Sequence, residues 1–115
     1  AIRASLKNEV ILLEGNDKCG KKILLTGNGR CNYWNENISI DSYHTDNLKK
    51  LEEIISSSNQ KEVLTFLEKM GLFPRIKNGY YYPFSNQASS VRNLLTRELN
   101  SSGLKFIMLK LFIKK

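Results

Sequence analysis

The sequence predicts an α/β fold for the first part of the chain and a helix–hairpin–helix arrangement for most of the rest. A continuous apolar run over residues 9–14 has the length of a strand buried on both faces, which is typical of a parallel sheet covered by helices. From residue 46 onward, apolar residues recur at helical spacing. Between two of these stripes, Asn78-Gly79 separates two short apolar segments and favours a tight hairpin turn.

The first predicted region covers residues 1–46 and begins with helix-forming residues 1–7. The strand over 9–14 follows and ends on an acid. We expect residues 26–32 to form a loop, because two glycines there are flanked by hydrogen-bonding side chains. Residues 33–45 are rich in Asn, Ser and Tyr with little periodicity, so we expect an irregular connection.

The second predicted region covers residues 47–103 and holds more regular elements. Asp46 is placed to cap a first helix, and Asn59 to cap a second helix that ends at Gly71. After the hairpin, a third helix opens near Ser85 or Asn86 and is expected to end at Gly103. Residues 104–115 form the third predicted region, a strand over 104–109 with a basic tail.

The chain carries a net charge of +7 that is unevenly distributed. Residues 1–46 contain six basic and six acidic residues, whereas residues 47–115 contain twelve basic and five acidic ones. Clustered basic residues near aromatic ones are typical of nucleic-acid binding, and Arg75, Lys77, Arg92 and Arg97 stand near three tyrosines. A basic nucleic-acid-binding module is therefore one alternative. An ordinary solvated surface is the simpler interpretation of the charge.

Composition and cysteine usage exclude several classes of protein. Hydrophobic content of 41% and charged content of 25% are those of a globular chain, and no apolar run reaches the about 18 residues that a spanning helix needs. Cys19 and Cys31 form no CxxC motif, and the single His44 offers no spacing for a metal site. We therefore expect free thiols, a cytoplasmic location and no membrane partner.

Glu14 is the first candidate functional residue. An acid that closes a buried strand can accept hydrogen bonds from a ribose hydroxyl in a dinucleotide-binding unit, where it follows a G-x-G-x-x-G turn by about 20 residues. Counting back from Glu14 passes the first residue of the chain. A plain carboxylate at a strand end is the alternative interpretation.

The loop over residues 26–32 is the second candidate. Gly27 and Gly29 permit close approach of the backbone to a ligand, Arg30 adds a charged donor, and the Asn32 amide can donate and accept. This set suits a phosphate or the polar edge of a heterocycle. The loop lacks the G-x-x-x-x-G-K-[ST] pattern of a P-loop, and a simple glycine turn with a surface arginine is the alternative.

These motifs also carry a family resemblance. The segment 14–35, with Gly-Lys-Lys-Ile-Leu-Leu-Thr-Gly-Asn-Gly-Arg-Cys-Asn over 20–32, resembles the signature of the BaiN-like NAD(P)/FAD-dependent oxidoreductases. The resemblance continues through residues 66–72 and 82–91 and extends to about residue 106. These proteins are flavoproteins with two dinucleotide-binding domains.

The resemblance implies a partial Rossmann-like FAD-binding half, followed by an α+β insertion that leads to the second domain. It places Glu14 at the adenosine ribose of FAD, and Lys22 and the loop along the flavin and its phosphates. The matching loop positions are Gly27, Gly29, Arg30, Cys31 and Asn32. For Cys31 we expect a packed or flavin-adjacent thiol rather than a catalytic one, because no second cysteine stands at dithiol spacing.

The family's first strand and its G-x-G-x-x-G turn have no counterpart before Ala1, and most of its second domain has none after Lys115. We therefore expect a fragment that binds FAD weakly or not at all by itself. In the complete protein, the resemblance implies FAD, a small-molecule substrate and either a reduced nicotinamide or oxygen as the second partner. The three tyrosines at 80–82 either line a substrate pocket or pack on the hairpin.

Overall fold

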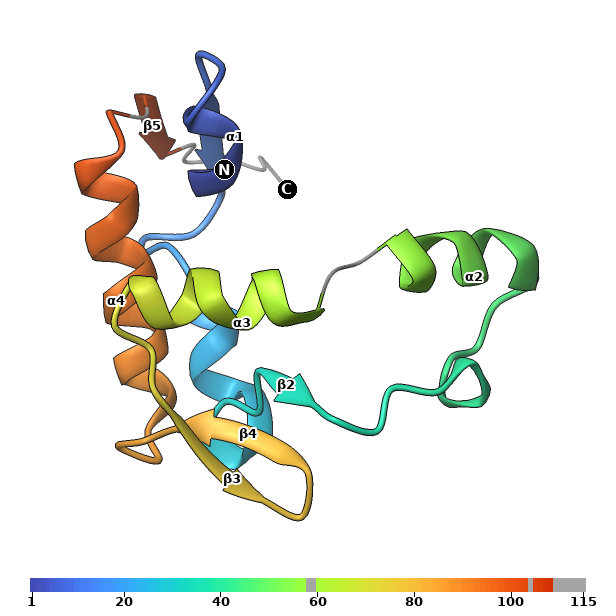
Figure 1. Ribbon diagram of the computed structural model, residues 1–115. Helices are drawn as coiled ribbons and strands as arrows, with labels where there is room; N and C mark the ends of the chain where they lie inside the picture. Colours follow the sequence, from blue (N-terminus) through green and yellow to red (C-terminus); the bar gives the residue numbers. More distant parts are fainter. Residues whose placement is uncertain (58–59, 104, 109–115) are drawn as a thin grey trace, which may run out of the picture.

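A computed structural model describes residues 1–57, 60–103 and 105–108 of the chain. It contains a parallel pair of strands, a three-stranded antiparallel sheet and helices between them (Figure 1). The predicted mixture of helices and strands is thereby confirmed. The division into regions 1–46, 47–103 and 104–115 stays a prediction. In the part of the chain that the structure describes, no helix is both long and apolar enough to cross a membrane.

The parallel pair joins the two ends of the described chain. After helix α1 (Ile2–Ser5), strand β1 (Ile11–Glu14) pairs with β5 (Lys105–Met108), so that Glu14 stands opposite Met108. The predicted strands at both places are confirmed, although residues 104 and 109 lie outside the described residues.

The predicted burial of β1 on both faces is wrong. The side chains of Ile11 and Leu13 are each 59% exposed, whereas Leu12 and Glu14 on the other face are half-buried. Successive side chains of a strand point to opposite faces, so each face needs its own cover. The described residues cover only one face of β1.

Segment η1 (Lys21–Gly29) and helix α4 (Ala88–Ser101) pack against each other; α4 runs along the left-hand side of the view in Figure 1. η1 begins as a 3-10 helix and breaks at Gly27 and Asn28, whose φ angles are both +54°. The predicted loop thus begins inside this segment. The core lies where this loop meets α4, and its buried members are Cys31, Leu72, Ala88 and Val91.

Helices α2 (Leu48–Ser57) and α3 (Gln60–Lys69) match the first two predicted helices. The cap of α2 is Asn47 rather than Asp46, because the Asn47 side chain accepts a hydrogen bond from the Lys50 backbone N–H at 3.0 Å. The proposed cap of α3, Asn59, lies outside the described residues. Helix α2 packs on the short 3-10 helix η2 (Ile40–Ser42) and stands away from the remaining elements (Figure 1). The radius of gyration is 16.3 Å, against about 13 Å for a compact domain of this length.

The predicted hairpin is confirmed as strands β3 (Pro74–Lys77) and β4 (Tyr80–Pro83). Its turn has φ angles of +52° at Asn78 and +77° at Gly79. A third strand, β2 (Trp34–Asn35), pairs with the free edge of β4. The expectation of an irregular connection over 33–45 is therefore wrong for β2, because a strand of two residues shows no periodicity and depends on its partner.

Candidate functional site

The carboxylate of Glu14 is held by the turn that follows β1. Oε1 accepts hydrogen bonds from the Asn16 backbone N–H at 3.0 Å and from the Asn16 side-chain amide at 2.7 Å. These bonds lower the pKa of Glu14, because they stabilise its charged form. Glu14 is thus an ionised acceptor of fixed orientation at the carboxyl end of a parallel strand, which is where open α/β sheets bind ligands.

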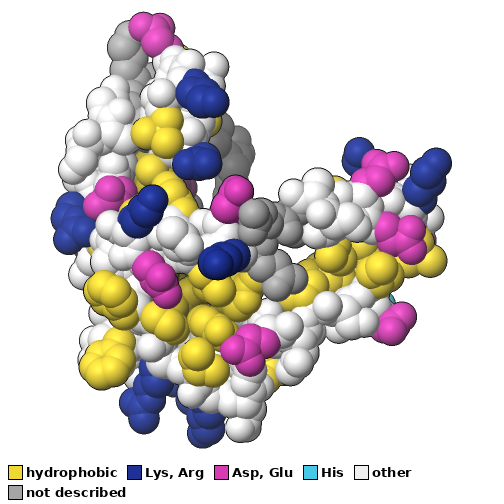
Figure 2. All heavy atoms as spheres, viewed as in Figure 1, with side chains coloured by type: hydrophobic (Ala, Val, Ile, Leu, Met, Phe, Trp, Pro, Cys, Tyr) yellow, Lys and Arg dark blue, Asp and Glu magenta, His cyan; other side chains and the backbone are white. Residues whose placement is uncertain are grey.

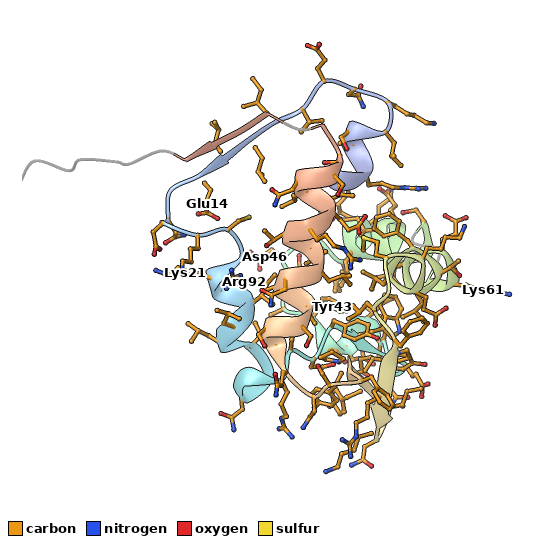
Figure 3. All side chains as sticks on the ribbon, turned by 90° about the vertical axis from the view of Figure 1, so that its left-hand side faces the viewer. Glu14, Lys21, Tyr43, Asp46, Lys61 and Arg92 are labelled. Atoms are coloured by element: carbon orange, nitrogen blue, oxygen red, sulfur yellow. The ribbon has the colours of Figure 1, made fainter. Side chains whose placement is uncertain are left out.

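The beginning of η1 lies close to this acid. Gly20 adopts a φ of +70°, and the Lys21 ammonium forms an ion pair with Asp17 at 2.6 Å. Figure 3 shows Glu14, Lys21 and Arg92 on the same side of the molecule, around the start of η1. Lys22 is exposed in the first turn of η1. One end of η1 is therefore rich in charged groups.

The glycine loop lies at the other end of η1, and Gly27 is the residue that its turn requires. A Cβ at Gly27 would lie 2.8 Å from the Asn32 backbone nitrogen. The turn is closed by a 3.1 Å hydrogen bond from the Cys31 N–H to the Thr26 carbonyl. Gly29 also has a positive φ, +78°, but a Cβ there would meet nothing within 4 Å. Gly27 is therefore required by the packing of the loop on Asn32, and the predicted approach of this backbone to a ligand stays a prediction.

Side chains of the loop fasten it to the hairpin and the core. The Arg30 guanidinium lies 5.4 Å from the centre of the Tyr82 ring, at cation–π distance. With its nitrogen placed as donor, the Asn32 amide reaches the carbonyls of Trp34 at 2.8 Å and Tyr81 at 3.2 Å. Cys31 is 7% exposed within the core. The packed thiol expected there is confirmed, and Cys31 contributes to the shape of the loop rather than to its open surface.

The predicted site residues thus form two groups rather than one cluster. Glu14 ends β1 and Lys22 lies in the first turn of η1. Gly27 and Gly29 lie at the other end of η1, and Arg30, Cys31 and Asn32 follow it, so η1 separates the two groups. An extended ligand is required to contact both groups.

Three residues near the first group are not predicted by the sequence. Asn16 orients Glu14, Gly20 allows the close approach of α4, and Arg92 lies against Gly20. An asparagine two residues after an acid is a weak sign of such a turn. The sequence singles out Arg92 only as one of the basic residues behind the nucleic-acid alternative, and nothing in its helix pattern predicts the contact with Gly20.

The tyrosines of β4 have different roles. Tyr81 lines a cavity of about 470 Å³ with Trp34 and Leu64, and its hydroxyl donates to a Glu36 carboxylate oxygen at 2.7 Å. That hydrogen bond raises the pKa of Tyr81. The Tyr82 ring instead makes the cation–π contact with the Arg30 guanidinium. Tyr81 thus lines a cavity, and a role of that cavity in substrate binding stays a prediction.

The basic residues behind the nucleic-acid alternative come from two elements, strand β3 and helix α4. Arg75 and Lys77 are on β3, Arg92 lies under Gly20, and the Arg97 guanidinium donates to the Met70 carbonyl at 2.8 Å. On the face shown in Figure 2, Lys and Arg side chains are scattered among acidic ones. On this face the charges form a mixed surface and no basic stripe is seen.

Comparison with known proteins agrees with the family resemblance. The family model of the HI0933-like protein Rossmann domain matches residues 1–113. The chain is 39% identical over 105 residues to the 3-dehydro-bile acid delta(4,6)-reductase of Clostridium scindens. That match covers 91% of this chain and 26% of the reductase, so the chain spans about a quarter of that relative's length. The resemblance to BaiN-like proteins is thus confirmed, and the chain belongs to the HI0933-like Rossmann-domain family.

Proposed function

We propose that this chain is part of the FAD-binding domain of an FAD-dependent oxidoreductase. The observation that carries the proposal is the ionised, oriented carboxylate of Glu14 at the carboxyl end of β1. A ribose presents neighbouring hydroxyl donors, and a carboxylate accepts such donors well. Both hydrogen bonds from Asn16 reach Oε1, so Oε2 is the oxygen proposed to accept from the adenosine ribose of FAD.

The second group of residues is proposed to contact the flavin and phosphate side of the same cofactor. A dinucleotide is long enough to contact both ends of η1. At the glycine loop, Gly27 brings two backbone segments together, and Arg30 supplies a positive charge supported by Tyr82. Lys22 adds an exposed ammonium at the near end. These groups suit an anionic, partly aromatic ligand.

When bound, the flavin supplies the hydride chemistry, and the residues described above bind and orient it. We propose a small-molecule substrate, with a reduced nicotinamide or oxygen as the second partner. The related Clostridium scindens protein is a reductase by its name, which supports a reductive reaction for this chain. A cytoplasmic location is proposed as well, since Cys19 and Cys31 are both free thiols.

The test is FAD affinity in the complete protein, measured by the change in flavin fluorescence on titration. Glu14→Ala should weaken FAD binding at least tenfold, because a hydrogen bond to a charged group contributes about 1.5–3 kcal/mol. Glu9→Ala is the matched control, since Glu9 is an exposed acid just before the same strand. Equal affinities of the two variants would contradict the role of Glu14. Failure of the wild-type protein to bind FAD would contradict the function itself.

A further inference from the structure

The guanidinium of Arg30 is held in place by two contacts. Its Nε donates a hydrogen bond to the Gly27 carbonyl at 3.3 Å, and its Cζ lies 5.4 Å from the centre of the Tyr82 ring. The first contact forms within the glycine loop, whereas the second comes from strand β4, which is distant in the sequence. The orientation of Arg30 therefore depends on the hairpin as well as on the loop.

The pairing of β2 with β4 brings the Tyr82 ring to Arg30. The Tyr33 backbone N–H donates to the Tyr81 carbonyl at 2.9 Å, and Trp34 pairs with Tyr81 as the first residue of β2. Successive side chains of a strand point to opposite faces. Tyr81 therefore lies on the face that lines the cavity with Trp34, and Tyr82 lies on the face that meets Arg30.

The two terminal nitrogens of Arg30 remain available for a ligand. Among the described residues, neither nitrogen has a hydrogen-bond acceptor or an acid within ion-pair distance. The neighbouring charge is also positive, because the exposed Arg75 stands opposite Tyr82 in the hairpin register. An arginine with free terminal nitrogens can donate to two oxygens of an anion at once. Arg30 is thus a donor whose orientation is set before a ligand arrives.

We propose that Tyr82 is a positioning residue for FAD binding and that it acts through Arg30. This inference rests on the proposed function, in which Arg30 contacts the flavin and phosphate side of FAD. Without the ring, the long Arg30 side chain samples more rotamers in the free protein, and binding has to order it. The cation–π contact orders the guanidinium in advance. The hairpin therefore contributes to FAD affinity through Arg30.

The first test compares the FAD affinities of tyrosine variants of the complete protein, measured by flavin fluorescence. Tyr82→Leu removes the ring and should weaken FAD binding about three- to tenfold, which is the effect of ordering one long side chain. Tyr82→Phe keeps the ring and should bind FAD as the wild-type protein does, because the Tyr82 hydroxyl has no hydrogen-bond partner among the described residues. Equal losses for Tyr82→Leu and Tyr82→Phe would overturn the proposal.

Tyr80→Leu is the matched control. Tyr80 lies two residues before Tyr82 on the same strand, and its side chain is 42% exposed. This variant should leave the FAD affinity unchanged. A loss as large as that of Tyr82→Leu would show that any change in β4 weakens binding, and it would overturn the specific role of Tyr82.

A double-mutant cycle with Arg30 distinguishes positioning from general damage to the hairpin. If Tyr82 acts through Arg30, Tyr82→Leu should have no further effect on FAD affinity in a protein that already carries Arg30→Met. The same loss of affinity in both backgrounds would show that the substitution acts on the hairpin itself, and it would overturn the proposal.

The failure of this inference can be distinguished from the failure of the proposed function. If the wild-type complete protein binds no FAD, the proposed function is contradicted and this inference with it. If the wild-type protein binds FAD and Arg30→Met weakens the binding but Tyr82→Leu does not, the proposed function stands and only the role of Tyr82 is overturned.

Discussion

Replacing Gly27 by alanine tests whether the glycine loop depends on close backbone approach. A Cβ at Gly27 would lie 2.8 Å from the Asn32 nitrogen, which is closer than real Cβ atoms come. Gly29→Ala is the matched control, because Gly29 also has a positive φ but has open space around it. Both substitutions require alanine in the left-handed region and both stiffen the unfolded chain. The difference between them therefore isolates the contact with Asn32.

The magnitude follows from these two contributions. Left-handed geometry costs an alanine about 1 kcal/mol, and we expect roughly that loss of unfolding free energy for Gly29→Ala. Forcing an extra methyl group into an occupied position adds about 1–3 kcal/mol, so Gly27→Ala should lose about 2–4 kcal/mol. The atom nearest to the added methyl group is the Asn32 backbone nitrogen. The Asn32 side chain also donates hydrogen bonds to the carbonyls of Trp34 and Tyr81, which limits how far Asn32 can move away.

The assay is urea denaturation followed by the fluorescence of Trp34, the chain's single tryptophan, which is half-buried in β2 next to the loop. The midpoint should decrease more for Gly27→Ala than for Gly29→Ala at an unchanged slope. Equal midpoints for the two variants would refute the argument, because they would show that the loop accommodates the methyl group at Gly27 with no additional loss of unfolding free energy.

Two further predictions concern the link between α3 and α4 and the dependence of stability on pH. Arg97→Met should lower the unfolding free energy by about 1 kcal/mol, because the Arg97 guanidinium donates a hydrogen bond to the Met70 carbonyl at 2.8 Å. Urea denaturation measures this loss, and an unchanged midpoint would contradict a role of this hydrogen bond in stability. Burial raises the pKa of Tyr33 to about 12 from its ordinary value of 10, so the folded chain holds this proton more tightly than the unfolded chain does. The contribution of Tyr33 to stability is fully present below pH 10 and is lost as the pH rises from 10 to 12. Urea midpoints measured at pH 9 and pH 11.5 should therefore fall less for Tyr33→Phe than for the wild-type chain, and equal falls would contradict this.

Several elements are predictable because local chemistry determines them. Asn78-Gly79 adopts positive φ angles and fixes the hairpin turn. Gly71, with a φ of +98°, ends α3 where the apolar stripe ends. Strand β2 is not predictable in this way, because its two residues become a strand only by pairing with β4. The exposure of Ile11 and Leu13 is not predictable either, since burial depends on which other residues cover the strand.

The residues of the candidate site also fall into those that the sequence predicts and those that it does not. Glu14 and the glycine loop are found from the sequence because each combines a residue type with a local spacing. Arg92 is not, because its significance arises from contact with Gly20, a residue more than seventy positions earlier in the chain. Asn16 is an intermediate case, since its hydrogen bonds to Glu14 are local but many asparagines in turns make none to an acid.

The most direct test of the proposed function is a double-mutant cycle between Glu14 and the adenosine ribose of FAD. Affinities of the wild-type and Glu14→Ala complete proteins are measured for FAD and for an analogue whose adenosine ribose lacks its 2′ and 3′ hydroxyls. If the Glu14 carboxylate accepts from these hydroxyls, the wild-type protein should bind the analogue about tenfold more weakly than FAD. The Glu14→Ala variant should bind the analogue and FAD with equal affinity. The same loss of affinity in both proteins would contradict the placement of the ribose at Glu14.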